Sequence, residues 1–482
     1  MILNSDNKKK SIAFFRRIID LGVGFKNQKR IVNRVVTEEI IERVHSESIP
    51  KVGKNVEDVL GEFEKNVLPF CINVSHKGFV GFPYAGNSVA SIGADIMKSF
   101  LQQNLMNHDW SPIATHIEIA LIKWLREIVG YEINVGKPGS IFSAGGLVTA
   151  GGTMSNFVAL LLAKKNSNEK GDKKRKYVLI PKDISHYSIR RSVELLNCGE
   201  ILEVEAKGFK YDIEDLKRKL MKFKGEILTV VAFAGDSKTG TIDDFQVINR
   251  VVKDSDSGIW LHADACHGFC LKFSTKLKDR LSGIEHFDSI SADPHKNLFM
   301  PYPLSFLLFR DNKFLEIMAD EDLINKEGVF DFGRVTPLLG SRAWDSLKLW
   351  FLIKNLGVGG IGKNIEHLNN IAEFAWKMLR KDADFEVVKR PDFNTVLFYY
   401  KGNKRLKSPE LDNLNFNIYK RIKSEGNYFL HSTKVCFDTK KGEKRQILRF
   451  MVGNPNCDTV AVRDMIYYVK KIAKGMESQP LK

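Results

Sequence analysis

The sequence predicts an α/β protein whose central unit is built on a mostly parallel β-sheet. Continuous apolar runs at residues 177–180, 227–232 and 258–261 have the length and composition of buried strands. Segments with helical periodicity separate such runs through residues 140–310, and this alternation is typical of a parallel sheet covered by helices. In such sheets the loops that follow the carboxyl ends of the strands form the ligand site.

Helices are predicted before this unit and a smaller α+β part after it. Apolar residues recur at three- and four-residue steps between residues 32 and 67, which indicates amphipathic helices whose apolar faces need a cover. A helical segment at 365–379 leads to strand-like runs at 385–388 and 395–400. We therefore expect a helical segment at 1–90, a large domain at 91–365 and a small domain at 366–482.

The composition is that of a globular protein with an excess of positive charge. The 482 residues carry a formal net charge of +16, and 43% of them are hydrophobic. The basic residues are scattered or lie in short runs without interleaved aromatic residues, so we expect no nucleic-acid partner. No apolar run approaches the length of about 18 residues that a membrane span requires, so we expect no membrane partner either.

The first residues and the cysteines favour a cytoplasmic location. Residues 1–8 lack the apolar core of a secretory signal. The six cysteines are sparse, and even the neighbours Cys266 and Cys270 do not have the paired spacing of a zinc site. We therefore expect reduced thiols and no bound metal.

Two short stretches carry the strongest chemical signal. Asp264 follows the strand-like run 258–261, and Lys296, preceded by His295, follows the run 289–291. A lysine and a carboxylate at neighbouring strand ends suit pyridoxal phosphate (PLP), because the lysine can form a Schiff base while the carboxylate keeps the pyridine nitrogen protonated. Alone, the aspartate would more often cap a helix and the lysine would be solvated, so the inference depends on the pair.

A glycine-rich stretch offers a place for the phosphate. Residues 151–156 (Gly-Gly-Thr-Met-Ser-Asn) precede an apolar helical segment. Backbone N–H groups, hydroxyl donors and the positive end of a helix dipole together form an anion cradle at such a position. The stretch is neither a Walker A loop nor a dinucleotide fingerprint, since no Gly-Lys-Ser/Thr follows and the glycine spacing differs.

These motifs resemble the group II PLP-dependent amino acid decarboxylases, which include aromatic amino acid, glutamate, cysteine sulfinate and diaminobutyrate decarboxylases. Residues 262–265 (His-Ala-Asp-Ala) resemble the family's His-x-Asp-Ala-Ala, and residues 293–296 (Asp-Pro-His-Lys) resemble its Asp-(Pro/Ala)-His-Lys. The likeness covers roughly residues 75–470. It implies a type I (aspartate aminotransferase-like) fold and a homodimer with shared active sites.

The resemblance also implies roles for single residues. Lys296 would hold PLP as an internal aldimine, and an L-amino acid would lose CO2 through a quinonoid to give the amine. The implied cofactor-binding residues are Thr153, Met154, His186, Ser237, Asp264, Ala265, His295 and Lys296. Lys296, His186 and His295 are the implied catalytic residues. Arg342 is the implied partner of the substrate carboxylate, a task that suits a guanidinium group.

The stretch at residues 76–88 bears on the substrate. In the family the matching segment helps to wall the substrate pocket, so Phe82 and Tyr84 are expected there, although a loop that merely fills a core would look alike. Glutamate decarboxylases have Asn-Gln where this chain has Gly81-Phe82. This departure favours a substrate with an aromatic or apolar side chain.

A second departure concerns the product. In most family members a tyrosine on a mobile loop after the lysine protonates the substrate Cα, whereas this chain has no tyrosine between Tyr302 and Tyr399. The loop is expected around 318–332 and offers Phe330. Family members with phenylalanine at that place carry out oxidative decarboxylation–deamination to an aldehyde. His295 or a residue of the partner subunit could supply the proton instead.

Decarboxylation to the amine is therefore the expected function, with two alternatives. A related PLP enzyme could form an aldehyde or cleave a carbon–carbon bond. A non-catalytic binding protein with a PLP-enzyme fold is the alternative from a different class, and the intact Lys296 and Asp264 disfavour it.

Overall fold

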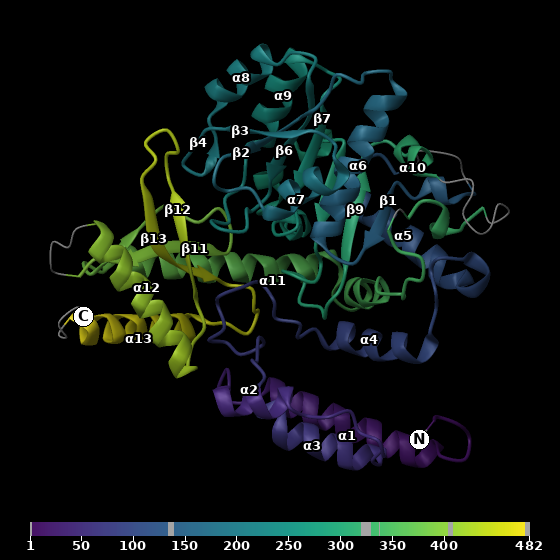
Figure 1. The fold of residues 1–482 in the computed structure, drawn as a ribbon, viewed down its shortest axis with the longest axis vertical. Helices are drawn as coiled ribbons and strands as arrows, with labels where there is room; N and C mark the ends of the chain where they lie inside the picture. The colour runs from purple at the N-terminus through teal and green to yellow at the C-terminus, as the bar shows by residue number, and fades with distance from the viewer. Residues whose placement is uncertain (1, 134–138, 320–328, 337, 403–407, 478–482) are drawn as a thin grey trace.

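The computed structural model describes residues 2–133, 139–319, 329–336, 338–402 and 408–477 (Figure 1). The tyrosine-free loop expected near 318–332 falls largely on residues 320–328, which lie outside the described residues. Within the described ranges, no helix combines the length and the apolar character needed to cross a bilayer.

Amphipathic helices form the N-terminal part, as the periodicity predicts. They project from one side of the molecule (Figure 1), and they are α1 (Lys8–Lys26), α2 (Glu38–His45) and α3 (Val56–Asn66). The apolar pattern that begins at residue 32 is only partly helical, because α2 starts after its N-cap Thr37. The next helix, α4 (Val89–Leu101), meets α1 through an edge-to-face contact between Phe100 and Phe15.

A seven-stranded sheet forms the centre of what we call the large domain. Its order is β1–β9–β8–β7–β6–β2–β3. Strands β8, β7, β6, β2 and β3 are parallel, and β9 runs antiparallel to both of its neighbours, so the predicted mostly parallel sheet is confirmed. The strands are β1 (Gly146–Thr149), β2 (Tyr177–Pro181), β3 (Glu200–Val204), β6 (Ile227–Phe233), β7 (Trp260–Asp264), β8 (Ser289–Ala292) and β9 (Ser305–Phe309).

Helices cover both faces of this sheet (Figure 1). Helix α6 crosses β6, β7, β8 and β9, because its apolar side chains match a sheet whose central strands are buried throughout. The helices of the large domain are α5 (Pro112–Val129), α6 (Gly152–Glu169), α7 (Tyr187–Leu196), α8 (Ile213–Lys222), α9 (Phe245–Ser255) and α10 (Lys313–Met318).

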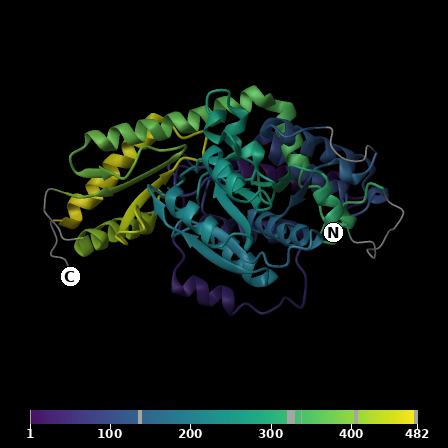
Figure 2. The ribbon, with the colours of Figure 1, turned by 90° about the horizontal axis from the view of Figure 1, so that it is seen from above.

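One long helix joins the large domain to a small domain. Helix α11 (Leu347–Lys381) is kinked at Gly357 (φ 62°), and residue 365, where we expected the domain boundary, lies inside it (Figure 2). The small domain holds an antiparallel sheet in the order β10–β11–β13–β12 with two further helices. These elements are β10 (Phe385–Val387), β11 (Thr395–Tyr400), α12 (Ser408–Glu425), β12 (His431–Cys436), β13 (Lys444–Met451) and α13 (Thr459–Glu477).

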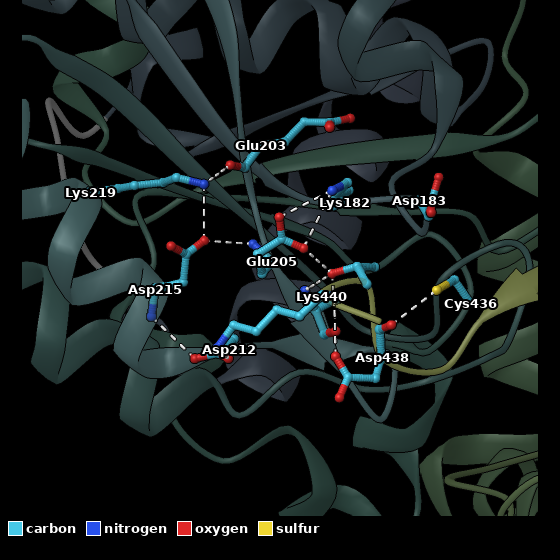
Figure 3. A network of polar contacts seen from close by, with 12 residues as sticks. Lys182, Asp183, Glu203, Glu205, Asp212, Asp215, Lys219, Cys436, Asp438 and Lys440 are labelled. Atoms are coloured by element: carbon cyan, nitrogen blue, oxygen red, sulfur yellow. Dashed lines mark hydrogen bonds and ion pairs between the residues drawn. The ribbon is translucent and has the colours of Figure 1, made fainter. Parts of the chain in front are cut away.

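Polar contacts fasten the β12–β13 hairpin to the large domain (Figure 3). The hairpin meets the short strands β4 (Ala206–Lys207) and β5 (Lys210–Tyr211), where Ala206 N donates to Thr439 Oγ1 over 2.7 Å and Thr439 N donates to Ala206 O over 2.9 Å. Lys440 pairs with Asp212 beside this contact. These contacts hold the turn between β12 and β13 of the small domain against β4 and β5, which follow β3 of the large sheet.

Candidate active site

A cavity of about 370 Å³ lies at the carboxyl edge of the large sheet. Asp264 ends β7, and the segment with Lys296 directly follows β8, whose register pairs Ser291 with Asp264. The loops after β1, β2 and β6 reach the same edge, while β13 contributes Arg449 and Met451 from the small domain. The position at strand ends and the volume are typical of a site for a small molecule.

The fold gathers most of the residues that the sequence analysis singled out. Those that line the cavity are Phe82, Tyr84, Thr153, His186, Ser237, Asp264, His295 and Lys296. Met154 and Ala265 adjoin lining residues in the chain, but they are not among the described residues that line the cavity.

Arg342 lies elsewhere. Its Nη1 and Nη2 donate to Oε2 and Oε1 of Glu118 over 3.0 and 2.6 Å, and both side chains are buried. The guanidinium group also lies over the ring of Phe332 at 5.0 Å. This bidentate ion pair neutralises the charge of Arg342 within the chain. Arg342 is not among the described residues that line the cavity.

Lys296 lies between carboxylates. Its Nζ is 3.0 Å from Oδ2 of Asp293, whose other oxygen, Oδ1, is buried and has no hydrogen-bond partner in the described part of the chain. Burial lowers the pKa of Lys296, but Asp293 and the other acidic groups around it outweigh burial, so the net shift is upward. The lysine is therefore a charged ammonium group in the cofactor-free protein, and its side chain is still 20% exposed toward the cavity.

Asp264 is a carboxylate despite its burial. Burial raises its pKa, whereas the nearby His186 and Lys296 and a hydrogen bond from Asn156 lower it, and the net shift is downward. An aspartate that stays ionised at the bottom of the cavity can hold a pyridine nitrogen in its protonated form.

Asn156 connects the two residues that would contact the pyridine ring. Its Nδ2 donates to Asp264 Oδ2 over 2.8 Å and to Ser188 Oγ over 2.9 Å. Ser188 Oγ lies 2.7 Å from Nδ1 of His186, which caps the start of α7. On its other side, Asn156 Oδ1 lies 3.0 Å from Nε2 of the buried His262. The sequence analysis quoted Asn156 only as part of the glycine-rich stretch.

The start of α6 provides an anion cradle of the right size. Residues 150–153 line the cavity, with Gly151 as the N-cap of the helix. A Cβ on Gly152 would lie 2.3 Å from Sγ of Cys266 and 2.8 Å from Oδ2 of Asp293, so only glycine lets the helix start come this close. The cradle, the lysine and the ionised aspartate together fit PLP, with the phosphate at the helix start and the pyridine nitrogen at Asp264.

Arg449 is the cavity residue that the sequence analysis missed. It lies on β13 and is 2% exposed, and burial lowers its pKa to about 10. Its Nη2 donates to Gly81 O over 2.9 Å, and its Nη1 donates to Ser237 O and, over 3.4 Å, to Lys238 O, while Nε has no hydrogen-bond partner among the described residues. All three acceptors are neutral backbone carbonyls, so within the described part of the chain this cation faces the cavity without a hydrogen-bonded carboxylate. The sequence carries no signal that separates an arginine that faces a cavity from one that only stabilises a buried strand.

The fold and this site define a PLP-dependent enzyme of the type I fold. The family model described as the pyridoxal-dependent decarboxylase conserved domain matches residues 39–401. The chain therefore belongs to the pyridoxal-dependent decarboxylase family, with PLP as its cofactor, and the resemblance inferred from the motifs is confirmed.

Curated and solved relatives match nearly the whole chain. Aromatic-L-amino-acid decarboxylase of Bacillus atrophaeus is 27% identical in an alignment of 492 positions that covers 98% of each protein. Phenylacetaldehyde synthase of Petunia hybrida is 25% identical over 458 residues, which cover 89% of this chain and 87% of that protein. The crystal structure of Oryza sativa TDC with PLP and tryptamine shares the fold with a TM-score of 0.86 at 20% identity, covering 99% of each chain.

Proposed function

We propose that this enzyme removes CO2 from an L-amino acid with an aromatic or apolar side chain and releases the amine. The observation that carries the proposal is the position of Arg449, a buried cation that among the described residues donates only to carbonyls, in the same cavity as Lys296 and Asp264. A substrate α-carboxylate would supply the missing negative charge. Burial of this carboxylate next to apolar rings favours cleavage of its bond to Cα, in which neutral CO2 leaves and the electron pair stays at Cα.

Each cavity residue has a distinct task in this proposal. Arg449, rather than Arg342, binds the α-carboxylate. His186, whose ring is held by its contact with Ser188, orients this carboxylate. Bound PLP supplies an electron-accepting ring when CO2 leaves. Asp264 holds a proton on the pyridine nitrogen, and Lys296 holds the aldehyde carbon.

The remaining predicted residues complete the cofactor site. Thr153 supplies a hydroxyl at the helix start and Ser237 supplies one at the loop after β6, with Met154 and Ala265 beside them in the chain. His295 donates from Nδ1 to Leu304 O over 2.6 Å, which fixes its ring next to Lys296.

Aromatic side chains wall the substrate end of the cavity. The rings of Phe82 and Tyr84 stack at 5.8 Å with an angle of 7° between their planes, and Tyr302 meets Tyr84 at 5.2 Å. Arg449 lies over the Phe82 ring at 5.4 Å. An apolar or aromatic substrate side chain fits such walls better than a carboxylate would.

We further propose a homodimer located in the cytoplasm. Helices α1 to α4 expose apolar side chains that a second copy of the chain would cover. These are Ile12, Ile18, Ile19, Val23, Ile41, Val44, Val59, Phe63, Ile96, Met97, Phe100 and Leu101. Sedimentation of the purified protein tests this point, and a monomer at micromolar concentration would contradict it.

Aldehyde formation is the second candidate function. It is favoured by the absence of any tyrosine between Tyr302 and Tyr399 and by the likeness to a protein named phenylacetaldehyde synthase. Cleavage of a different carbon–carbon bond has no comparable support in the cavity.

A product analysis on PLP-loaded protein tests the proposal. CO2, amine, aldehyde and hydrogen peroxide are measured for each amino acid, with Lys296→Ala as the inactive control. CO2 with an equal amount of amine supports decarboxylation. CO2 with aldehyde and peroxide supports the second candidate, and no CO2 from any amino acid would overturn both.

A further inference from the structure

Two phenols meet inside the cavity, and their hydroxyl groups have no role in the tasks described above. Tyr84 and Tyr302 both line the cavity, with ring centroids 5.2 Å apart in an edge-to-face contact. The ring of Tyr302 also lies 4.6 Å from that of His295, the residue next to Lys296. A pair of neighbouring phenols beside the reacting lysine is a candidate for proton transfer.

Tyr84 lies between the two residues that would hold the ends of the substrate. Its ring stacks on that of Phe82, over which Arg449 lies at 5.4 Å. On its other side it meets Tyr302, whose ring is next to His295 and hence to Lys296. Lys296 marks the nitrogen end of the substrate in the proposed function, and Arg449 marks its carboxylate end. The Cα atom of a substrate held by those two groups would lie between them, in the part of the cavity that Tyr84 lines.

Tyr302 connects this phenol to solvent. It is 51% exposed, whereas Tyr84 is half-buried. Burial, and then the neighbouring Tyr84, raise the pKa of Tyr302, so its phenol keeps its proton at neutral pH. Tyr302 can therefore pass a proton from solvent toward the more buried Tyr84.

The histidine next to the lysine is a poorer donor. His295 Nδ1 carries a proton, because it donates to the carbonyl oxygen of Leu304 over 2.6 Å. Burial lowers the pKa of His295, so the ring holds only that one proton at neutral pH and Nε2 has none to give. The free electron pair on Nε2 suits it to accept hydrogen bonds.

We propose that Tyr84 is the acid that protonates Cα after CO2 has left, and that Tyr302 is the residue that positions and recharges it. This inference rests on the proposed decarboxylation. The O–H bond of Tyr84 breaks and a C–H bond forms at Cα with the electron pair left by CO2. The Tyr84 phenolate then accepts a hydrogen bond from Tyr302 and regains a proton from water at the exposed end of the pair.

The first test compares Tyr84→Phe with wild type on the PLP-loaded enzyme. Without the acid, the electron pair at Cα is open to dioxygen, which takes two electrons to give peroxide while water and the substrate yield aldehyde and ammonia. We expect the ratio of amine to peroxide to fall by at least about tenfold while CO2 is still released. Tyr467→Phe, at an exposed tyrosine of α13, is the matched control and should keep the wild-type ratio. An unchanged ratio in Tyr84→Phe would overturn the assignment.

A second test needs neither cofactor nor turnover. Fluorotyrosine is incorporated, and the 19F resonance of Tyr84 is identified by its loss in Tyr84→Phe. In cofactor-free Tyr302→Phe this resonance should move to a different chemical shift, because the phenol that contacts the Tyr84 ring has lost its hydroxyl group. A resonance that keeps its wild-type chemical shift would show that Tyr302 does not support Tyr84.

The outcomes separate this inference from the proposed function. A wild-type enzyme that releases no CO2 would overturn the proposed function and this inference with it. Aldehyde and peroxide as the main wild-type products would overturn amine formation and this inference with it. An amine yield that survives Tyr84→Phe would overturn only the role of Tyr84.

Discussion

The side-chain amide of Asn156 donates a hydrogen bond of 2.8 Å to Oδ2 of Asp264, and both residues are buried. The same amide holds Ser188, which contacts His186. One asparagine at the start of α6 thus orients the carboxylate below the expected pyridine ring and the histidine beside it.

Replacement of this asparagine should weaken cofactor binding. In Asn156→Leu, Asp264 loses a hydrogen bond to its charged form, which is worth about 1.5–3 kcal/mol. We expect the affinity for PLP, measured from its visible absorbance on titration, to fall by about tenfold or more. Asn168→Leu, at an exposed position of the same helix, is the control and should bind PLP like wild type. Equal affinities of the two variants would contradict the role of Asn156.

The two arginines should respond differently to the same substitution. Arg449→Met removes the cation in the cavity, so binding of an amino acid should weaken strongly while the free energy of unfolding changes less. Arg342→Met leaves Glu118 as a buried unpaired carboxylate, which costs about 3–5 kcal/mol of stability. Urea unfolding and substrate titration of both variants check this contrast. Loss of substrate binding in Arg342→Met, in protein that is still folded, would restore Arg342 as the carboxylate partner.

The cofactor-free protein should lose stability as the pH falls below about 6.5. Burial lowers the pKa of His262 to about 4 and that of His267 to about 3, from an ordinary value of 6.5. Below 6.5 the unfolded chain takes up protons that the folded chain does not, so stability is complete above 6.5 and is lost toward the folded-state values. At pH 5 the loss is about 2 kcal/mol for each histidine.

Urea unfolding at pH 7.5 and pH 5 measures this loss. His267→Gln removes one of the two titrating groups, so the difference in unfolding free energy between the two pH values should shrink by about 2 kcal/mol. A difference that is the same in the variant and in wild type would show that His267 is not buried in its neutral form.

The hairpin contact should contribute to the attachment of the small domain. Thr439→Val removes the hydroxyl that accepts from Ala206 N and contacts Glu205, leaving a buried donor unpaired at a cost of about 1–3 kcal/mol. Hydrogen exchange at the Ala206 amide should accelerate accordingly. Thr433→Val on β12 has no such contact among the described residues and should leave that exchange unchanged.

The sequence by itself determined the architecture of the large domain and the identity of the cofactor. Buried parallel strands are continuous apolar runs, so β2, β6 and β7 could be recognised locally. Asp264 and Lys296 follow such runs, and parallel strands bring their carboxyl ends to one edge. Helices α2 and α3 were predicted from periodicity, although the start of α2 was not, because the apolar pattern begins at residue 32 and the helix only after Thr37.

Only the tertiary structure decided which arginine faces the cavity and which phenols meet there. Arg342 and Arg449 look alike in the sequence, and the difference arises because Glu118 on α5 neutralises the first, while the second donates only to backbone carbonyls among the residues that the structure describes. Tyr84 and Tyr302 are more than two hundred positions apart in the chain and meet only in the fold. Charge compensation and proton transfer depend on distances of a few ångströms between distant segments, and no local pattern encodes those distances.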